Sequence, residues 1–264
     1  MASPSYERVL ITGASSGIGR GMALWFARRG ATVWATARRT RNLEALAAEG
    51  EGRIRAVAMD VTKEADTVAA IQRIDDECGG LDLVVANAGV GGPTPAHVAD
   101  WPMVERRLRT NVMGAAATIT AVLPRMVQRG RGHVAGVSSV AGYGALGAHS
   151  SYNGSKAFLS MFLECLAIDL HGTAVKVTCI EPGFVKSEMS DLLEGKAPMP
   201  FRASTEAAVE KFCTAIIKGK KRIAWPQVHA VSASLAKYVP TPVLKSASLS
   251  QLVLAEEELK ARLP

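Results

Sequence analysis

Short apolar runs alternate with longer segments of helical period along most of this chain, and no other feature restricts its fold as strongly. The apolar runs are rich in Val, Ile and Ala and nearly continuous, which is typical of strands covered on both faces. They lie at 9–12, 32–37, 54–59, 81–86, 133–138 and 175–180. Strands that alternate with helices are joined by right-handed crossovers in a parallel sheet. The sequence therefore predicts an α/β protein with a doubly wound parallel sheet, a Rossmann-type fold.

Segments of helical period fill the intervals between these runs, and we predict helices at 18–29, 41–49, 64–77, 101–127 and 151–170. In the longest of them Pro102 suits the first helical turn, whereas Pro124 should kink or shorten the end. No Gly/Ser-rich linker divides the chain. We therefore expect one domain over residues 1–264, with a loop at 184–203 and a C-terminal helical extension at 204–264.

The net charge and the cysteine content limit which binding partners and which cellular compartment are expected. The 31 Lys and Arg residues against 24 Asp and Glu give a net charge of +7, which favours an anionic partner without choosing among nucleotide, nucleic acid and lipid. The four cysteines form no CxxC pair and the five histidines have no metal-ligand spacing, so neither a disulfide framework nor a metal site is expected. The N-terminus lacks the pattern of a secretory signal and no apolar run is long enough to span a bilayer, so a cytoplasmic protein is expected.

A glycine-rich turn, TGASSGIG at 12–19, joins the first predicted strand to the first predicted helix. Glycines there permit a tight turn and a close approach of the backbone to a diphosphate, while the helix N-terminus offers free N–H groups to an anion. A glycine cluster alone is weak evidence, but a strand before it and a helix after it favour dinucleotide binding. The candidate contacts are Gly13, Ser15, Ser16, Gly17, Ile18 and Gly19.

Two arginines stand where an NAD-binding protein usually offers an acidic residue to the ribose, at the end of the second strand. Because a guanidinium matches a 2′-phosphate well, Arg38 and Arg39 favour NADP(H) over NAD(H). The alternative is that both are ordinary solvated residues that open a helix. Asp60 and Val61 end the third strand, where a carboxylate could face the adenine amino group, although Asp is also common in turns.

Tyr152 and Lys156 are candidates for the chemistry because four residues of a helix place them on one face. A phenol titrates near pH 10, so acid/base work at neutral pH needs a shift of about three units, roughly 4 kcal/mol. A nearby ammonium supplies about 1–3 units, and the nicotinamide ring or hydrogen bonds could add the rest. Such a pair also arises by chance, so the context matters. Ser138 and Ser139 end the fifth strand at the carboxyl edge, where ligands bind in open α/β sheets, and at least one of them is expected to have only a turn role.

In this order and on these elements, the motifs resemble the short-chain dehydrogenase/reductase family over residues 8–187. The matching motifs are TGASSGIG at 12–19, DV at 60–61, ANAG at 86–89, Asn111, Ser139, YNGSK at 152–156 and PGFVKS at 182–187. The resemblance implies that Tyr152 is the general acid/base and that Lys156 lowers its pKa and binds the nicotinamide ribose. It further implies that Ser139, thirteen residues before Tyr152, orients the substrate oxygen, and that Asn111 holds a water linking Lys156 to solvent.

The resemblance also implies further cofactor contacts, at Asp60, Val61, Asn87, Ala88, Gly89, Tyr152, Lys156, Pro182, Gly183, Val185 and Ser187. Ala86 stands where the family usually has Asn, and Ser187 stands where Thr is usual but still offers a hydroxyl to the nicotinamide carboxamide. NADP-preferring members often carry a basic residue within the glycine turn. Here serines occupy it, so the NADP preference depends on the arginines after the second strand.

These observations predict an NADP-dependent oxidoreductase that transfers a hydride between nicotinamide and a carbonyl or secondary alcohol. The loop at 184–203 and the segments 90–98 and 140–148 are mostly apolar, which favours a lipophilic small molecule. The alternative is a non-catalytic sensor or scaffold that binds NADP. The joint presence of Asn111, Ser139, Tyr152 and Lys156 argues for the enzyme.

Two surfaces leave the question of partners open. Phe158, Met161, Phe162 and Cys165 follow Tyr152 on its helix and could serve a homodimer or homotetramer, as the family resemblance implies, or belong to the core. The basic run at 218–222 is either a solvated loop before a short strand or part of a weak membrane-surface contact. That contact would add Trp225, Lys237, Tyr238 and Lys245. Nucleic-acid binding has no supporting fold motif.

Overall fold

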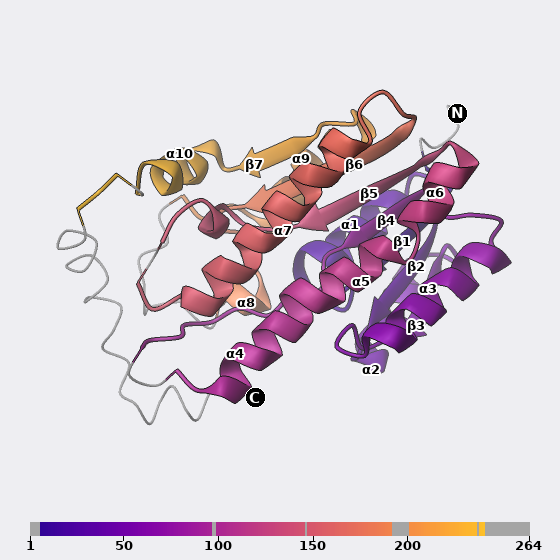
Figure 1. The fold of residues 1–264 in the computed structure, drawn as a ribbon. Helices are drawn as coiled ribbons and strands as arrows, with labels where there is room; N and C mark the ends of the chain where they lie inside the picture. Colours follow the sequence, from indigo (N-terminus) through magenta and orange to yellow (C-terminus); the bar gives the residue numbers. More distant parts are fainter. Residues whose placement is uncertain (1–5, 97–98, 146, 192–200, 237, 241–264) are drawn as a thin grey trace.

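A parallel sheet forms the centre of the computed structural model (Figure 1), which describes residues 6–96, 99–145, 147–191, 201–236 and 238–240. Its strands are β1 (Arg8–Thr12), β2 (Thr32–Ala37), β3 (Ile54–Ala58), β4 (Leu83–Ala86), β5 (Gly132–Val137), β6 (Val175–Pro182) and β7 (Arg222–Trp225). Within the described residues these form one seven-stranded sheet in the order β3-β2-β1-β4-β5-β6-β7. Every pairing is parallel, as the alternation of strands and helices predicts. The order changes direction between β1 and β4, and ligands of open α/β sheets bind at such a point.

Helices cover both faces of the sheet (Figure 1) and form two buried clusters with it. On one face lie α1 (Gly17–Ala27), α2 (Thr40–Glu49) and α9 (Thr205–Ile217). On the other lie α3 (Glu64–Glu77), α5 (Ala115–Thr120), α6 (Leu123–Arg129) and α7 (Ser150–Asp169). The remaining helices are α4 (Trp101–Leu108), η1 (Arg109–Gly114), η2 (Val140–Gly142), α8 (Glu188–Asp191) and α10 (Gln227–Ala236).

The long helix predicted at 101–127 is divided in the structure. Asp100 caps the start of α4 by accepting a hydrogen bond from the Met103 N–H at 2.9 Å. The π-helical segment η1 then follows, and α5 ends at Thr120. Pro124 lies in the first turn of α6, because a residue without an N–H is tolerated only where no helical partner is needed. The sequence predicted the interruption at Pro124 but not the π-helical segment.

The region after residue 204 contributes more than the helical extension expected from the sequence. The short strand β7 pairs with β6 and extends the sheet. The helix α9 contributes Phe212, Cys213 and Ile216 to the core, all fully buried. Trp225 packs edge-on against Phe212 and Arg222 pairs with Glu181, so both are engaged with the body of the protein. Lys237 and Lys245, two residues of the expected lipid contact, lie outside the described residues.

The strand predicted at 54–59 is not buried on both faces, although the sequence predicted that it would be. In β3, Arg55, Ala56 and Ala58 are exposed, because β3 lies at the edge of the sheet and pairs only with β2. In the part of the chain that the structure describes, no helix combines the length and apolar character needed to cross a membrane. The same residues contain no group of three or more His, Cys, Asp and Glu side chains that could hold a metal ion.

Candidate active site

The glycine-rich turn after β1 packs directly against the end of β4. Gly13 adopts a φ of +67°, and a Cβ there would lie 2.6 Å from the Ala88 Cα. A Cβ on Gly19 would lie 2.3 Å from the Asn87 Nδ2. Both approaches exclude any side chain at these positions, so the glycines permit the turn to close onto β4.

Asn87 and Thr12 fix that contact with four hydrogen bonds. The Asn87 side-chain amide donates to the carbonyls of Thr12 (2.9 Å) and Gly13 (3.2 Å). In return the Thr12 hydroxyl accepts the backbone N–H groups of Asn87 (3.0 Å) and Ala88 (3.1 Å). The amide of Asn87 therefore holds the carboxyl ends of β1 and β4 together, beside the place where the sequence puts the cofactor.

One of the two predicted arginines reaches over the glycine turn. The Arg39 guanidinium donates to the hydroxyls of Ser15 (3.0 and 3.2 Å) and Ser16 (2.7 Å). Its third nitrogen pairs with the Glu188 carboxylate at 2.8 Å. Arg38 is exposed next to it. The cluster of one guanidinium and two hydroxyls suits the 2′-phosphate of NADP, so the residues present fit that cofactor.

The loop after β6 approaches the same turn. A Cβ on Gly17 would lie 3.5 Å from the Ser187 Cβ, which places Ser187 beside the helix start. Pro182 and Val185 are buried, and Val185 pairs with Ala203. His229 of α10 holds this loop, since its Nδ1 accepts the Phe184 N–H at 3.2 Å. Residues 192–200 of the predicted substrate loop lie outside the described residues, as does Leu146 on the facing segment.

Asp60 and Val61 have local roles in the structure. One carboxylate oxygen of Asp60 accepts the N–H (3.0 Å) and the hydroxyl (2.9 Å) of Thr62, which is the turn role that the sequence left open. Val61 is buried against η1, where a Cβ on Gly114 would lie 2.8 Å from the Val61 side chain. The contact that the sequence predicts with the adenine amino group would use the other carboxylate oxygen of Asp60.

Ser139 and Tyr152 meet at the carboxyl edge of the sheet. Ser139 precedes η2, accepts the Ala141 N–H at 3.1 Å and donates to the Pro182 carbonyl at 3.3 Å. The hydroxyl also lies near the phenol of Tyr152, in the first turn of α7, and lowers the pKa of that phenol. These contacts bring together the side chains that the sequence predicted for the substrate oxygen.

Ser138 points into the protein instead. Its hydroxyl donates to the Lys156 carbonyl (2.7 Å) and is hydrogen-bonded to Ser160 (2.8 Å). The Ser160 hydroxyl is in turn bonded to the buried carboxylate of Glu181 at 2.9 Å, which Tyr143 and Arg222 also contact. This chain of contacts fixes α7 on β5 and β6. Of the two serines, Ser138 therefore has the structural role.

Lys156 is buried one turn after Tyr152. Its Nζ donates to the Val137 carbonyl at 2.8 Å and lies 5.9 Å from the centre of the Tyr152 ring. Burial lowers the pKa of Lys156 to about 8. The ammonium form still dominates at neutral pH, so the side chain can supply a positive charge to this part of the site.

Asn111 lies in η1 and joins two parts of the site. Its side chain exchanges two hydrogen bonds with the backbone of Val90, at 2.8 and 2.9 Å, and donates a third to the Ser155 hydroxyl at 3.0 Å. A Cβ on Gly89 would lie 3.4 Å from both the Asn111 Oδ1 and the Lys156 Nζ. Asn111 therefore holds the loop after β4 against α7, close to the ammonium group.

The electrostatics of Tyr152 differ from the sequence expectation. Burial raises the pKa of Tyr152 above its usual value, while the nearby Ser139 hydroxyl and the charge of Arg107 lower it without reversing the sign. The sequence assigned the lowering to Lys156, with the nicotinamide ring or hydrogen bonds adding the rest, and Arg107 was missed. Its position four residues before Asn111, on the same helical face, is a signal that could have found it.

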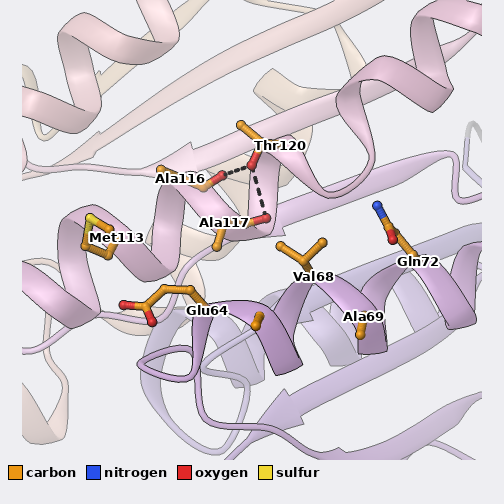
Figure 2. A pocket seen from close by; sticks show the side chains of 9 residues that line it. Glu64, Val68, Ala69, Gln72, Met113, Ala116, Ala117 and Thr120 are labelled. Carbon is orange, nitrogen blue, oxygen red and sulfur yellow. Dashed lines mark hydrogen bonds between the residues drawn. The ribbon is translucent and has the colours of Figure 1, made fainter.

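A separate hollow of about 530 Å³ lies between α3 and the η1–α5 segment (Figure 2). It is open and mostly apolar, with Val68, Ala69 and Met113 among its lining residues. Ser139, Tyr152 and Lys156 do not line it, so it is distinct from the candidate active site.

Comparisons with known proteins agree with this geometry. The family model described as short chain dehydrogenase matches residues 7–197. An uncharacterized oxidoreductase of Myxococcus xanthus is 50% identical over 94% of this chain and 98% of its own length. An NADP-dependent 3-hydroxy acid dehydrogenase of Salmonella typhi is 39% identical over 67% of this chain and 72% of its own length.

A solved structure of serine dehydrogenase complexed with NADP⁺ matches with a TM-score of 0.74 at 30% identity, over 82% of this chain and 93% of that one. The family match over most of the chain and the likeness in fold lead to one conclusion. The chain belongs to the short-chain dehydrogenase family of oxidoreductases.

Proposed function

We propose that this protein is an NADP(H)-dependent oxidoreductase that interconverts a carbonyl and a secondary alcohol, with Tyr152 as the general acid/base. The observation that carries the proposal is the placement of the buried Lys156 ammonium 5.9 Å from the centre of the Tyr152 ring, with Ser139 beside them at the carboxyl edge of the sheet. The glycine turn and Arg39 lie at the same edge and supply a nucleotide site.

The residues of this chain would hold NADP(H) at three points. Gly13, Gly17 and the start of α1 offer backbone to the diphosphate, and Arg39 with Ser15 and Ser16 would grip the 2′-phosphate. Ser187 and Lys156 would contact the nicotinamide end. When bound, the nicotinamide supplies the hydride or accepts it. The NADP dependence of the Salmonella typhi relative and the NADP⁺ complex of serine dehydrogenase support this cofactor.

Acid/base work then falls to Tyr152 and its neighbours. Ser139 donates a hydrogen bond that orients the substrate oxygen, and Tyr152 gives its proton to that oxygen in reduction or removes the proton in oxidation. Lys156 favours the ionised phenol by its charge. Asn111 bonds both to the loop after β4 and to helix α7, and it would thereby fix the distance between these two walls of the site.

For the substrate we propose a lipophilic ketone, aldehyde or secondary alcohol. Phe184 and Met189 in the described part of the loop after β6 are exposed beside the site, and they favour an apolar ligand. A second class, small 3-hydroxy acids, is favoured by the names of the relatives. NADPH oxidation with a panel of lipophilic ketones, and NADP⁺ reduction with 2-octanol, 3-hydroxypropionate and L-serine, separate the two classes.

Tyr152→Phe tests the proposal directly. The substitution removes the proton but keeps the ring, so we expect turnover to fall by about 10²–10⁴-fold. NADPH affinity measured by fluorescence should stay within about threefold, which shows that the site is intact. Turnover within tenfold of the unmodified protein would contradict the assigned role. Tight NADPH binding with no turnover on any compound of the panel would favour the alternative, a non-catalytic sensor.

We also propose that the chain forms a homodimer or homotetramer through α7. Met161 and Ile168 are exposed on this helix, and Phe158 stacks on Phe162 beside them. The helix lies next to α4, where Trp101 is exposed (Figure 1). Apolar side chains grouped on neighbouring helices favour a second copy of the chain as the partner.

A further inference from the structure

A buried cation with no assigned role lies beside the proposed acid/base. Arg107 of α4 is 2% exposed. Its guanidinium donates to the hydroxyls of Thr94 and Ser151, each at 2.5 Å, and more weakly to the Gly91 carbonyl at 3.4 Å. All three partners are neutral. Within the described residues no carboxylate forms an ion pair with this side chain, although other buried or half-buried arginines such as Arg129 have one.

A buried guanidinium with only neutral partners lowers the stability of the folded protein. Burial lowers the pKa of Arg107, but a guanidinium keeps its proton at neutral pH, so this part of the interior contains a positive charge that no carboxylate of the described residues pairs with. Such a charge is unfavourable unless another group develops negative charge nearby. Tyr152 is that group when it loses its proton.

The hydrogen bonds of Arg107 connect the segments around the phenol. Ser151 precedes Tyr152 in the first turn of α7, and Thr94 belongs to the loop after β4. The two hydroxyls are also hydrogen-bonded to each other at 2.9 Å, and the Thr94 N–H donates to the Ala148 carbonyl at 2.5 Å. Arg107 therefore holds the first turn of α7 from the side of α4.

The other charged and titratable groups around Tyr152 come from several elements. Lys156 lies on α7 itself, His149 precedes that helix, and Arg106 neighbours Arg107 on α4. On β6, Cys179 and Glu181 face α7 and are engaged with Ser160. Tyr143, at the end of η2, and Arg222, on β7, both contact Glu181. Besides Lys156, the charge of Arg107 is the one among these that lowers the pKa of the phenol.

We infer that Arg107 is a positioning residue for the proposed reaction, a fixed charge that favours the ionised form of Tyr152 while its hydrogen bonds hold the turn that carries this tyrosine. The inference depends on the proposed role of Tyr152. In alcohol oxidation the phenolate accepts the substrate proton, so the rate rises with pH through the ionisation of Tyr152. Removal of the charge should move that rise to higher pH.

The test is the pH profile of kcat for NADP⁺-dependent oxidation of 2-octanol or L-serine, whichever the unmodified protein oxidises. Arg107→Met and Arg107→Gln should move the rising limb by about one pH unit, which is about a tenfold loss below the limb and little loss above it. Arg109→Met removes an exposed cation two residues away and should leave the limb unchanged.

A uniform loss of rate at every pH, with the limb unmoved in both neutral variants, would overturn the inference and leave Arg107 as a purely structural residue. If Arg107→Met does not fold, Arg107→Gln, which keeps donors for Thr94 and Ser151, decides alone. ¹³C NMR titration of the tyrosine Cζ in the NADP⁺ complex, assigned with Tyr152→Phe, should show the same upward shift without turnover. Active Tyr152→Phe would refute the proposed function, whereas an unmoved NMR titration would refute the role of Arg107.

Discussion

At the scale of the residue, the structure separates the two predicted arginines by their contacts. Both are exposed, but Arg39 donates hydrogen bonds to Ser15 and Ser16 across the glycine turn. The sequence predicted a phosphate site after β2 but could not choose between neighbours, because the direction of each side chain depends on how the turn folds back onto it. The pairing of Arg39 with Glu188, 149 residues away, was equally invisible.

We expect Arg39→Ala to weaken NADPH binding by about 10- to 100-fold, since a charge-assisted contact to phosphate is worth about 1.5–3 kcal/mol. NADH, which lacks the 2′-phosphate, should bind Arg39→Ala as it binds the unmodified protein. Fluorescence titration with both cofactors measures this, and Arg38→Ala is the matched control, with a smaller loss. Tighter binding of NADH than NADPH by the unmodified protein would contradict the cofactor assignment.

The predicted chemistry of the site came from spacing along one helix. Tyr152 and Lys156 are recognisable in the sequence because helix geometry places them on one face, whereas the choice of Ser139 over Ser138 came from the resemblance to the family. The partner of each serine was not predictable, since Ser138 reaches α7 through Ser160 and Glu181. Arg107 was missed for the same reason. Its relevance depends on the packing of α4 against α7.

At the scale of the element, a buried ionic cluster joins α3 to α6. The Asp75 carboxylate is 1% exposed and accepts hydrogen bonds from Arg125 (2.8 Å), from Arg129 (2.6 Å) and from the Leu81 N–H (2.7 Å). Burial raises the pKa of Asp75, but the hydrogen bond and charge of Arg129, the Leu81 N–H and Arg125 together outweigh it and leave the pKa below its usual value.

We expect Asp75→Asn to lower the free energy of unfolding by about 2–3 kcal/mol, because the substitution takes the paired carboxylate from Arg129 and one of two from Arg125, both of which are partly exposed. Urea unfolding followed by circular dichroism measures the loss. Asp76→Asn, at the exposed neighbour that contacts only Arg125, should cost less than about 1 kcal/mol. Equal losses in the two variants would show that the cluster does not hold these helices together.

A second element-scale prediction concerns β5. His133 is fully buried between Tyr6, whose hydroxyl is 2.6 Å from Nδ1, and Thr178, whose hydroxyl is 2.8 Å from Nε2. Burial lowers the pKa of His133 to about 3. Because the unfolded chain binds this proton near pH 6.5, the neutral imidazole stabilises the fold above that pH, and the contribution is lost as the pH falls towards 3.

Between pH 6 and 4 the free energy of unfolding should therefore fall by up to about 1.4 kcal/mol per pH unit from this side chain. His133→Gln, which has no proton to gain in this range, should flatten that part of the profile even though it is less stable at pH 7. Urea unfolding at several pH values checks both expectations. Parallel profiles for the two proteins would contradict the buried neutral histidine.

At the scale of the whole molecule, the alternation of strands and helices predicted the fold class, but not the order of the strands. That order depends on which crossovers pass over which face, which is a property of the packed layers and not of any segment. The clearest case is β7, a four-residue strand next to a basic run that becomes the seventh strand only because β6 offers it an edge.

Assembly is the prediction that belongs to this scale. Met161→Glu places a charge on the exposed apolar side of α7, so we expect size-exclusion chromatography with light scattering to show a smaller assembly than the unmodified protein. Val231→Glu, at an equally exposed apolar side chain of α10, should leave the assembly unchanged. If both variants keep the mass of the unmodified protein, or if the unmodified protein is itself a monomer, the interface is not on α7.

Within the described residues, β3 and β7 each pair with another strand on one side only. In β3, Arg55 is exposed and its guanidinium stacks 5.0 Å from the Trp34 ring, while Pro226 follows β7 directly and has no N–H to offer. A foreign strand added at either side would meet a fixed charge or a missing donor. We therefore expect β3 to be a poor template for pairing with a foreign strand, because an added strand would lie against a fixed positive charge.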